Sequence, residues 1–185
     1  FDKTAKLLGI EFPGGPIIED WAKKGDENYF NLPKPILKKG GCNLSFAGLK
    51  TAVLKISKKI KSKKEKYHLA ASFQKTINII LKEKTKVAMK EFLKTTKNKK
   101  NTFVIAGGVA SNFSIRENLI KLAEDNKFNP VFPEKNLCSD NAAMIAWAGI
   151  ERYKINLLDD LKFPSRARWP LDSTAPFLKG AGLKF

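Results

Sequence analysis

The stretch TFVIAGGVASN, residues 102–112, decides the fold class of this chain. Residues 102–106 are β-branched, aromatic or apolar, and two glycines follow them, which is typical of a buried strand that ends in a tight turn. A helix is expected to start at Ser111 or Asn112, because apolar residues then recur at helical spacing from Ile115 to Leu122.

Similar patterns flank this stretch on both sides. A second short apolar run at 130–132 leads into a strongly apolar helix that we expect from Ala142 to about Tyr153. Upstream, one apolar stripe predicts a long helix from Tyr67 to about Lys97, with at most one interruption. The alternation of strands and helices predicts an α/β fold.

The first 60 residues mix helix and loop patterns. Phe1 to Gly9 suits the last turns of a helix with a glycine stop. Residues 12–16 predict a turn, because proline fixes φ and glycine permits positive φ. Beyond the turn we expect a helix at 17–24, a loop at 29–41, a strand-like alternation from Leu44 to Leu49 and a helix from Lys50 to Ile60.

The composition is that of a globular chain with one core. It has 185 residues, 43% of them hydrophobic, and a mean hydropathy of −0.30. No apolar stretch is long enough for a membrane span and no signal peptide pattern opens the chain, so we expect a cytoplasmic location. We expect Cys42 and Cys138 to be reduced and His68 to be an exposed helical histidine, while residues 163–171 predict a surface tail packed by its aromatics.

The net charge of +17 favours polyanionic partners such as RNA. Of the 35 basic residues 31 are Lys, and phosphate clamps of fixed geometry use Arg more often, so the charge alone identifies no binding face. The run from Lys55 to Lys66 holds seven lysines and one Glu. It fits a solvated helix end and loop, and it also fits a patch that faces tRNA.

Two polar segments at element boundaries have both a structural and a functional interpretation. After Gly107 and Gly108, Asn112 either caps a helix or reads a ribose or base edge, since the two glycines let a flat ring approach the main chain. Asp140, in Ser139-Asp140-Asn141, either caps the following helix or ligates a metal ion through oxygen.

The proline-glycine turn carries a third set of candidates. Asp2 and Glu19 can accept hydrogen bonds from sugar hydroxyls, and Gly15 can let a ligand lie against the loop. Taken singly, each also fits an ordinary turn glycine or surface acid.

Six ordered blocks of sequence resemble the TsaD family, also called glycoprotease-like or O-sialoglycoprotein endopeptidase-like. They are FDKTAKLLGIEFPGGP, NLSFAGLKTAV, AASFQ, VIAGGVASN, LCSDNAAMIA and RARWPLD. The resemblance implies the second lobe of the two-lobed fold shared with actin, Hsp70-type ATPases and sugar kinases (ASKHA), a mixed sheet flanked by helices. Residues 1–185 would form this C-terminal lobe, with a helical and loop segment at 1–40, an α/β core at 41–155 and a tail at 156–185.

The resemblance also implies a reaction. Such enzymes move the threonylcarbamoyl group from threonylcarbamoyl-adenylate to the exocyclic amine of the adenosine beside the anticodon, in tRNAs that read codons starting with A. One divalent metal ion, iron or zinc, is held by two histidines of an HxxxH helix in the first lobe and by an aspartate that Asp140 matches. The HxxxH helix and the SGG loop are absent here, so we expect the chain alone to be inactive.

The implied substrate pocket is carried over residue by residue. Asp2 and Gly15 match residues that contact the adenylate, Asn112 matches the asparagine that reads the nucleoside, and Glu19 matches a ribose-binding acid of some members. The expected partners are tRNA and TsaB-like and TsaE-like proteins. SFAGLK departs from the commoner SFSGLK by loss of a hydroxyl.

Three alternatives stay open at this point. An ATPase or sugar-kinase lobe of the same superfamily would also use the paired glycines. A non-catalytic TsaB-like scaffold would lack metal ligands, which the SDNAAM and PGGP segments count against. A basic RNA-binding module would account for the charge, although no RNA-binding signature is present.

Overall fold

The computed structural model describes residues 1–96 and 101–163, and the structural statements below concern these residues. Contacts divide the chain into two units, Phe1–Asn141 and Ala142–Phe185. The elements of the first unit are α1 (Asp2–Leu7), α2 (Gly14–Ala22), α3 (Ala47–Ser57), α4 (Lys63–Thr95), β1 (Thr102–Val104), η1 (Gly108–Ser111), α5 (Phe113–Asp125), β2 (Asn129–Val131) and η2 (Lys135–Leu137). The second unit contains α6 (Ala142–Lys154), close to the predicted range.

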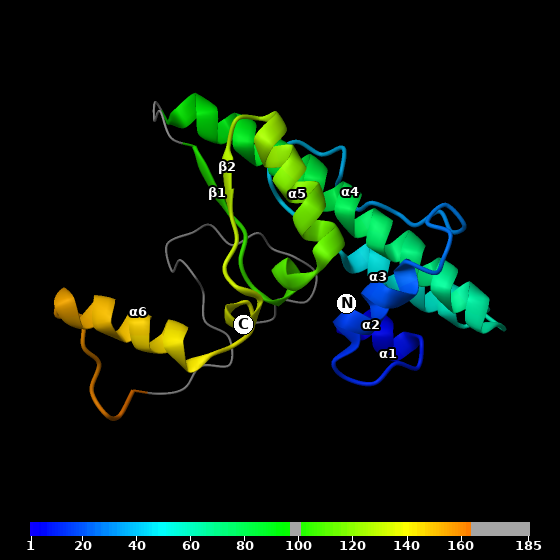
Figure 1. The fold of residues 1–185 in the computed structure, drawn as a ribbon, viewed down its shortest axis with the longest axis horizontal. Coiled ribbons are helices and arrows are strands. Elements are labelled where there is room, and N and C mark those ends of the chain that lie inside the picture. The colour runs from blue at the N-terminus through cyan, green and yellow to red at the C-terminus, as the bar shows by residue number, and fades with distance from the viewer. Residues whose placement is uncertain (97–100, 164–185) are drawn as a thin grey trace. The chain divides into compact units, whose positions relative to one another are not determined.

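The two strands form a parallel pair, with α5 as the connection between them (Figure 1). Thr102 pairs with Asn129 and Val104 with Val131. The α/β class is therefore confirmed, although the sheet of the described residues has only two strands. β1 is shorter than its apolar run, 102–106, because the strand pairing ends before the glycine turn, whereas β2 has the predicted length and begins one residue earlier, at Asn129.

The long helix α4 is the centre of the first unit. It contacts α2, α3 and α5, and Figure 1 shows α5 lying alongside it. Its inner face buries Leu69, Phe73, Ile77 and Ile80, four residues at helical spacing. The 33-residue helix has no interruption.

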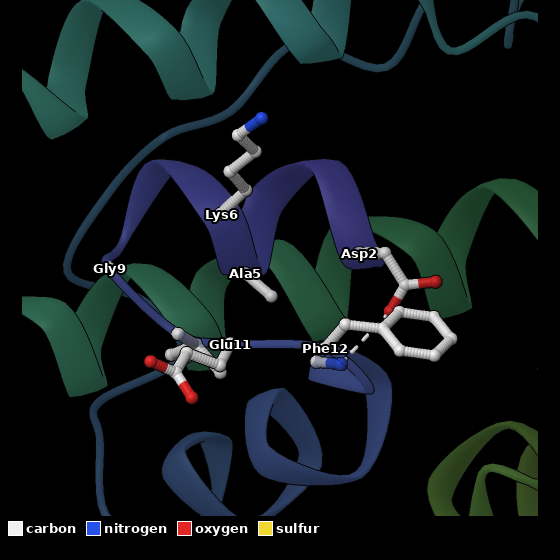
Figure 2. Close-up of a pocket in the computed structure, with 8 residues that line it drawn as sticks. Asp2, Ala5, Lys6, Gly9, Glu11 and Phe12 are labelled. Atoms are coloured by element: carbon white, nitrogen blue, oxygen red, sulfur yellow. Dashed lines mark hydrogen bonds between the residues drawn. The ribbon is translucent and has the colours of Figure 1, made fainter.

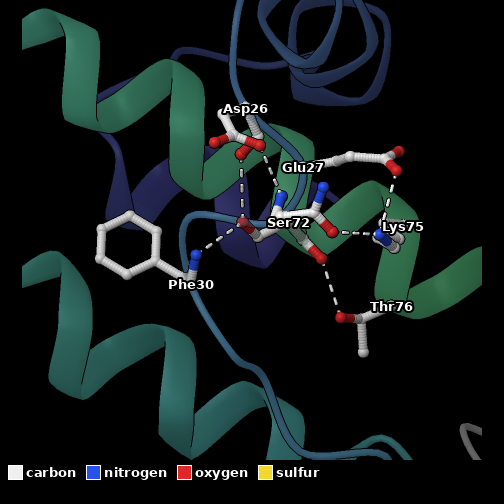
Figure 3. Close-up of polar contacts among 7 residues, drawn as sticks. Asp26, Glu27, Phe30, Ser72, Lys75 and Thr76 are labelled. Carbon is white, nitrogen blue, oxygen red and sulfur yellow. Dashed lines mark hydrogen bonds and ion pairs between the residues drawn. The ribbon is translucent and has the colours of Figure 1, made fainter.

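A loop after α2 is fixed to α4 by polar contacts (Figure 3). The Ser72 hydroxyl accepts from the Phe30 amide at 3.1 Å and donates to the Asp26 carbonyl at 3.5 Å. The Asp26 amide donates to Nδ1 of His68 at 2.8 Å, and the imidazole stacks on Tyr29 with centroids 4.4 Å apart. His68 is helical, as predicted, but it is partly buried and not exposed, because Asp26 and Tyr29 pack against its ring.

The segment from Leu44 to Leu49 is not a strand. The α3 helix begins at Ala47, and the Lys50 amide donates to the Phe46 carbonyl at 3.0 Å. Leu49 and Val53, four residues apart, are the buried positions of α3, so helical periodicity prevails over the brief alternation.

The helix α2 begins earlier than predicted, at Gly14, directly after the cis bond between Phe12 and Pro13. Positive φ is not the reason for glycine at position 14. A Cβ there would lie 2.1 Å from the Cβ of Ala5, so glycine permits close packing of α1 on α2.

Several other predictions can be compared with the structure. Cys42 and Cys138 are both free, the first exposed and the second buried. The lysine run spans the end of α3, the connecting turn and the start of α4, and its lysines are exposed except Lys66. Among the described residues, no helix has the length and apolarity to cross a membrane. The predicted aromatic tail at 163–171 lies outside them from residue 164 onward.

Candidate functional site

The carboxylate of Asp2 holds the start of α2. Its Oδ1 accepts hydrogen bonds from the amides of Gly14 at 3.1 Å and Gly15 at 3.2 Å. A carboxylate is favoured there because the first amides of a helix are unpaired and the helix dipole is positive at that end. Asp2 is exposed, and only one of its two oxygens makes these contacts.

Glu19 makes an equivalent contact from α2 to α5. Its Oε1 accepts from the amides of Phe113 at 2.7 Å and Ser114 at 3.2 Å, although these residues are more than 90 positions away in the chain. Glu19 follows Gly15 by one helical turn, so one face of α2 connects the Asp2 contact to the first turn of α5.

Asn112 is the N-cap of α5. Its Oδ1 accepts from the Ile115 amide at 3.0 Å and from Nε2 of Gln74 at 3.3 Å, and its Nδ2 donates to Oε1 of Gln74 at 3.0 Å. The capping interpretation is therefore confirmed. Asn112 is only 8% exposed, and these bonds leave one amide N–H for a further partner. Asp2, Gly15, Glu19 and Asn112 thus belong to one set of contacts that joins α1, α2 and α5.

Gly15 and Gly108 leave the backbone of the site open, and Gly107 permits the turn after β1. Gly107 has φ +88°, which allows the sharp turn after β1. A Cβ added at Gly108 would meet nothing within 4 Å, and one at Gly15 would meet only the Cβ of Phe1 at 3.9 Å. Glycine at these two positions is not required by packing within the described chain, which fits close approach of a ligand to the main chain.

Asp140 lies in the segment after β2. It is exposed, and its carboxylate makes no hydrogen bond or ion pair with the described residues, so it does not cap α6. Within the same part of the chain no group of three His, Cys, Asp or Glu side chains could hold a metal ion. The Asp140 carboxylate therefore suits the role of a single oxygen ligand to a metal ion, but the described residues do not form a complete metal site.

Asn112 and Asp140 follow neighbouring parallel strands. The segment 107–112 comes after β1, and the segment 133–140 comes after β2. Parallel strands end at the same edge of a sheet, and open α/β folds bind ligands outside that edge. The topology therefore brings the two candidates to one edge of the pair.

Two cavities are lined by residues of α1. One, of about 520 Å³, lies between α1 and the turn before α2 and includes Asp2, Gly9, Phe12 and Gly14 (Figure 2). The other, of about 550 Å³, is mainly apolar. Four of the six sequence blocks meet in its lining, at Phe1, Phe46, Phe73 and Val109 among others.

Sequence reasoning missed two residues of this region, Gln74 and Arg116. Gln74 is the last residue of the AASFQ block. It is buried on α4, where it is the hydrogen-bond partner of Asn112. Arg116 is one of only four arginines in a lysine-rich chain, and that rarity was the available signal.

Glycine turns at helix starts, polar side chains at the carboxyl edge of parallel strands and an exposed aspartate in an α/β protein are features of ligand sites in open α/β folds. Comparison with known proteins gives the family. The family model for TsaD, tRNA N6-adenosine threonylcarbamoyltransferase, matches residues 1–147. The chain belongs to the TsaD family.

Curated relatives of that name cover the chain almost completely. The protein of Pelagibacter ubique (strain HTCC1062) is 63% identical over 184 residues, which are 100% of this chain and 52% of the relative. The Zymomonas mobilis protein is 46% identical over 184 residues, 100% of the chain and 50% of the relative. The Rhodospirillum rubrum protein is 44% identical over 186 residues, 98% of the chain and 51% of the relative. The chain therefore spans about half the length of these relatives.

Proposed function

We propose that this chain is the C-terminal lobe of an ASKHA-type tRNA threonylcarbamoyltransferase. The observation that carries the proposal is that Asp2 holds the start of α2 at Gly15 and Glu19 holds the start of α5, which Asn112 caps, in a chain of the TsaD family. These residues come from three segments, and Asp2, Gly15 and Asn112 belong to blocks on which the family resemblance rests. Family membership also favours the transferase over a sugar-kinase lobe, a TsaB-like scaffold or a basic RNA-binding module.

The proposed substrate is threonylcarbamoyl-adenylate, a mixed anhydride. The amine at N6 of the tRNA adenosine attacks the carbamoyl carbon, the bond from that carbon to the phosphate oxygen breaks, and AMP leaves while the amine loses a proton. The free oxygen of Asp2 and the remaining N–H of Asn112 are suited to a ribose or base edge. The open backbone at Gly15 and Gly108 lets the nucleotide lie against the main chain. Their common role is to bind and orient the adenylate.

A metal ion, iron or zinc, would be held by Asp140 and by two histidines from the other half of the protein. When bound, it would supply Lewis-acid polarisation of the carbamoyl carbonyl. Asp140 suits this role because its carboxylate is exposed and has no protein partner in the described part of the chain.

The proposal includes macromolecular partners. The net charge of +17 supports attraction to tRNA. We further propose TsaB-like and TsaE-like protein partners, and a cytoplasmic site of action where tRNA is modified.

The substitution Asp140→Ala in the full-length protein tests this function. We expect loss of bound metal and at least about a hundredfold less threonylcarbamoyl-adenosine in tRNA, with an unchanged circular dichroism spectrum. Metal analysis and nucleoside mass spectrometry measure the two effects. Asp125→Ala is the matched control, because Asp125 is also an exposed carboxylate and lies at the end of α5. Normal metal content and normal modification in Asp140→Ala would refute the assignment.

A further inference from the structure

Arg116 lies on α5, one helical turn after Asn112, and connects the two segments of the candidate site. Its Nε donates to the carbonyl of Ala110, which follows β1. Its Nη2 donates to the carbonyl of Pro133 at 3.0 Å and to Sγ of Cys138 at 3.3 Å, both of which follow β2. A single guanidinium therefore bridges the segments that end at Asn112 and at Asp140.

The geometry of this bridge requires arginine. The guanidinium carbon lies 4.8 Å from the ring centroid of Phe132, so the planar group rests on an aromatic side chain while its edges donate in different directions. A lysine ammonium has no planar fork and cannot stack in this way. In a chain with 31 lysines, arginine at this position supplies a planar shape that the common basic residue lacks.

The bridge ends close to the candidate metal ligand. Cys138, one of its three acceptors, is buried and comes two residues before Asp140. Asp140 itself has no bond to the described residues, so its segment is held by contacts such as those at Pro133 and Cys138. Ala110, at the other end of the bridge, is buried two residues before Asn112.

We propose that Arg116 is a positioning residue for the transfer reaction, which sets the Asp140 segment relative to the Asn112 turn. The inference rests on the proposed function, because a fixed distance between the nucleotide and the metal matters only for the transfer reaction. Arg116 acts through the two segments it bridges. Its loss would displace Asp140 while leaving most adenylate contacts in place, and a small displacement of a reacting group lowers the rate of the chemical step.

The experiment compares Arg116→Lys with Arg152→Lys in the full-length protein. Both changes keep the charge, and Arg152 is a suitable control because it makes an exposed ion pair with Asp159 on the surface of the second unit. Steady-state kinetics of threonylcarbamoyl transfer give kcat and KM for the adenylate. Hydrogen exchange measured by mass spectrometry reports the opening of residues 133–141 without reference to activity.

For Arg116→Lys we expect kcat to fall about 10- to 100-fold while KM changes less than about threefold. Exchange in 133–141 should become about tenfold faster, and exchange in α4 should not change. Arg152→Lys should match the parent protein in both. A role in stability alone would lower the unfolding midpoint of Arg116→Lys and leave kcat unchanged, and that result would overturn the proposal, as would unchanged exchange in 133–141.

A second variant keeps the test decisive if Arg116→Lys does not fold. Cys138→Ala removes one acceptor of the bridge and leaves the two carbonyl contacts, so we expect a smaller increase of exchange in the same peptide; unchanged exchange there would contradict the bridge. If the parent protein shows no transfer activity, the proposed function fails, and the exchange measurement still decides whether Arg116 fixes the segment.

Discussion

At the scale of single residues, Gly25 lets the loop after α2 touch the backbone of α4. A Cβ at this position would lie 2.1 Å from the Tyr67 carbonyl oxygen and 2.7 Å from the His68 amide nitrogen. The obstacle is helix backbone, which cannot move aside as the end of a flexible side chain can. The polar contacts of Asp26 and Phe30 with α4 depend on this close approach.

We therefore predict that Gly25→Ala destabilises the fold by about 1–3 kcal/mol, as overpacking does. Urea unfolding of the variant and the parent measures the change. Gly40→Ala is the control, because a Cβ at Gly40 meets nothing within 4 Å and the expected change is under about 0.5 kcal/mol. Equal stability of the two variants would contradict the packing argument.

The sequence predicted some residue roles and left others undetermined. It predicted Asn112 as a cap or a ligand, because asparagine before an apolar-periodic segment suits a helix start. The pairing with Gln74 is not predictable from local pattern, since the partner lies 38 positions earlier on another helix. For the same reason the sequence predicts Glu19 only as a surface acid or a ribose ligand. Its hydrogen bonds to the first turn of α5 are visible only in the folded structure.

At the scale of elements, α4 starts at a capping box that local sequence encodes fully. The Ser62 hydroxyl accepts from the Glu65 amide at 3.1 Å, and Oε2 of Glu65 accepts from the amides of Lys61 and Ser62, both at 3.0 Å. The amide of Lys61, followed by the Ser62 side chain and amide, lowers the pKa of Glu65 from its ordinary value of 4.5. The start of α4 is therefore most stable when Glu65 is ionised.

This arrangement predicts a pH dependence. Because the folded-state pKa is below 4.5, Glu65 contributes stability above that pH and loses it as the pH falls through the lowered value. The stability difference between the parent and Glu65→Ala should be constant near neutral pH and shrink below about pH 4.5. Urea unfolding at several pH values measures it. Glu65→Gln keeps an acceptor but no charge, so its stability should depend less on pH in this range than the stability of the parent. A stability difference between the parent and Glu65→Ala that stays constant down to pH 3 would contradict the mechanism.

Elements with long apolar periodicity were predictable, whereas the type or the bounds of short elements were less so. The α4 and α5 helices have sustained apolar stripes, so their existence followed from pattern. The α4 helix nevertheless begins at Lys63, four residues before the predicted Tyr67, because the Ser62–Glu65 capping box extends it. The segment from Leu44 to Leu49 alternates over too few residues to distinguish a strand from a helix. Its second half belongs to α3, which buries Leu49 and Val53 at helical spacing in the core. The strands lie where they were predicted, but β1 ends two residues before its apolar run does and β2 begins one residue before its own, because strand limits depend on pairing with the partner strand.

At the scale of the whole molecule, the candidate site is gathered by topology. Asp2, Gly15 and Glu19 lie within the first 20 residues, whereas Asn112 and Asp140 follow strands more than 100 residues from the start. Their order in the sequence supported the family resemblance, and the family match to residues 1–147 confirms it. The sequence does not predict how α2–α5 contacts and a parallel strand pair assemble these residues, and the structure is required to show it.

The central claim is that the Asn112 turn and Asp140 converge on one bound nucleotide. Proton relaxation of AMP in the manganese-substituted full-length protein tests it most directly, because Mn²⁺ accepts carboxylate ligands and relaxes only nearby nuclei. We predict strong relaxation of the AMP sugar and base protons in the parent protein, and loss of the effect in Asp140→Ala while AMP still binds. Equal relaxation in both proteins, or none in a parent that binds both Mn²⁺ and AMP, would contradict the account.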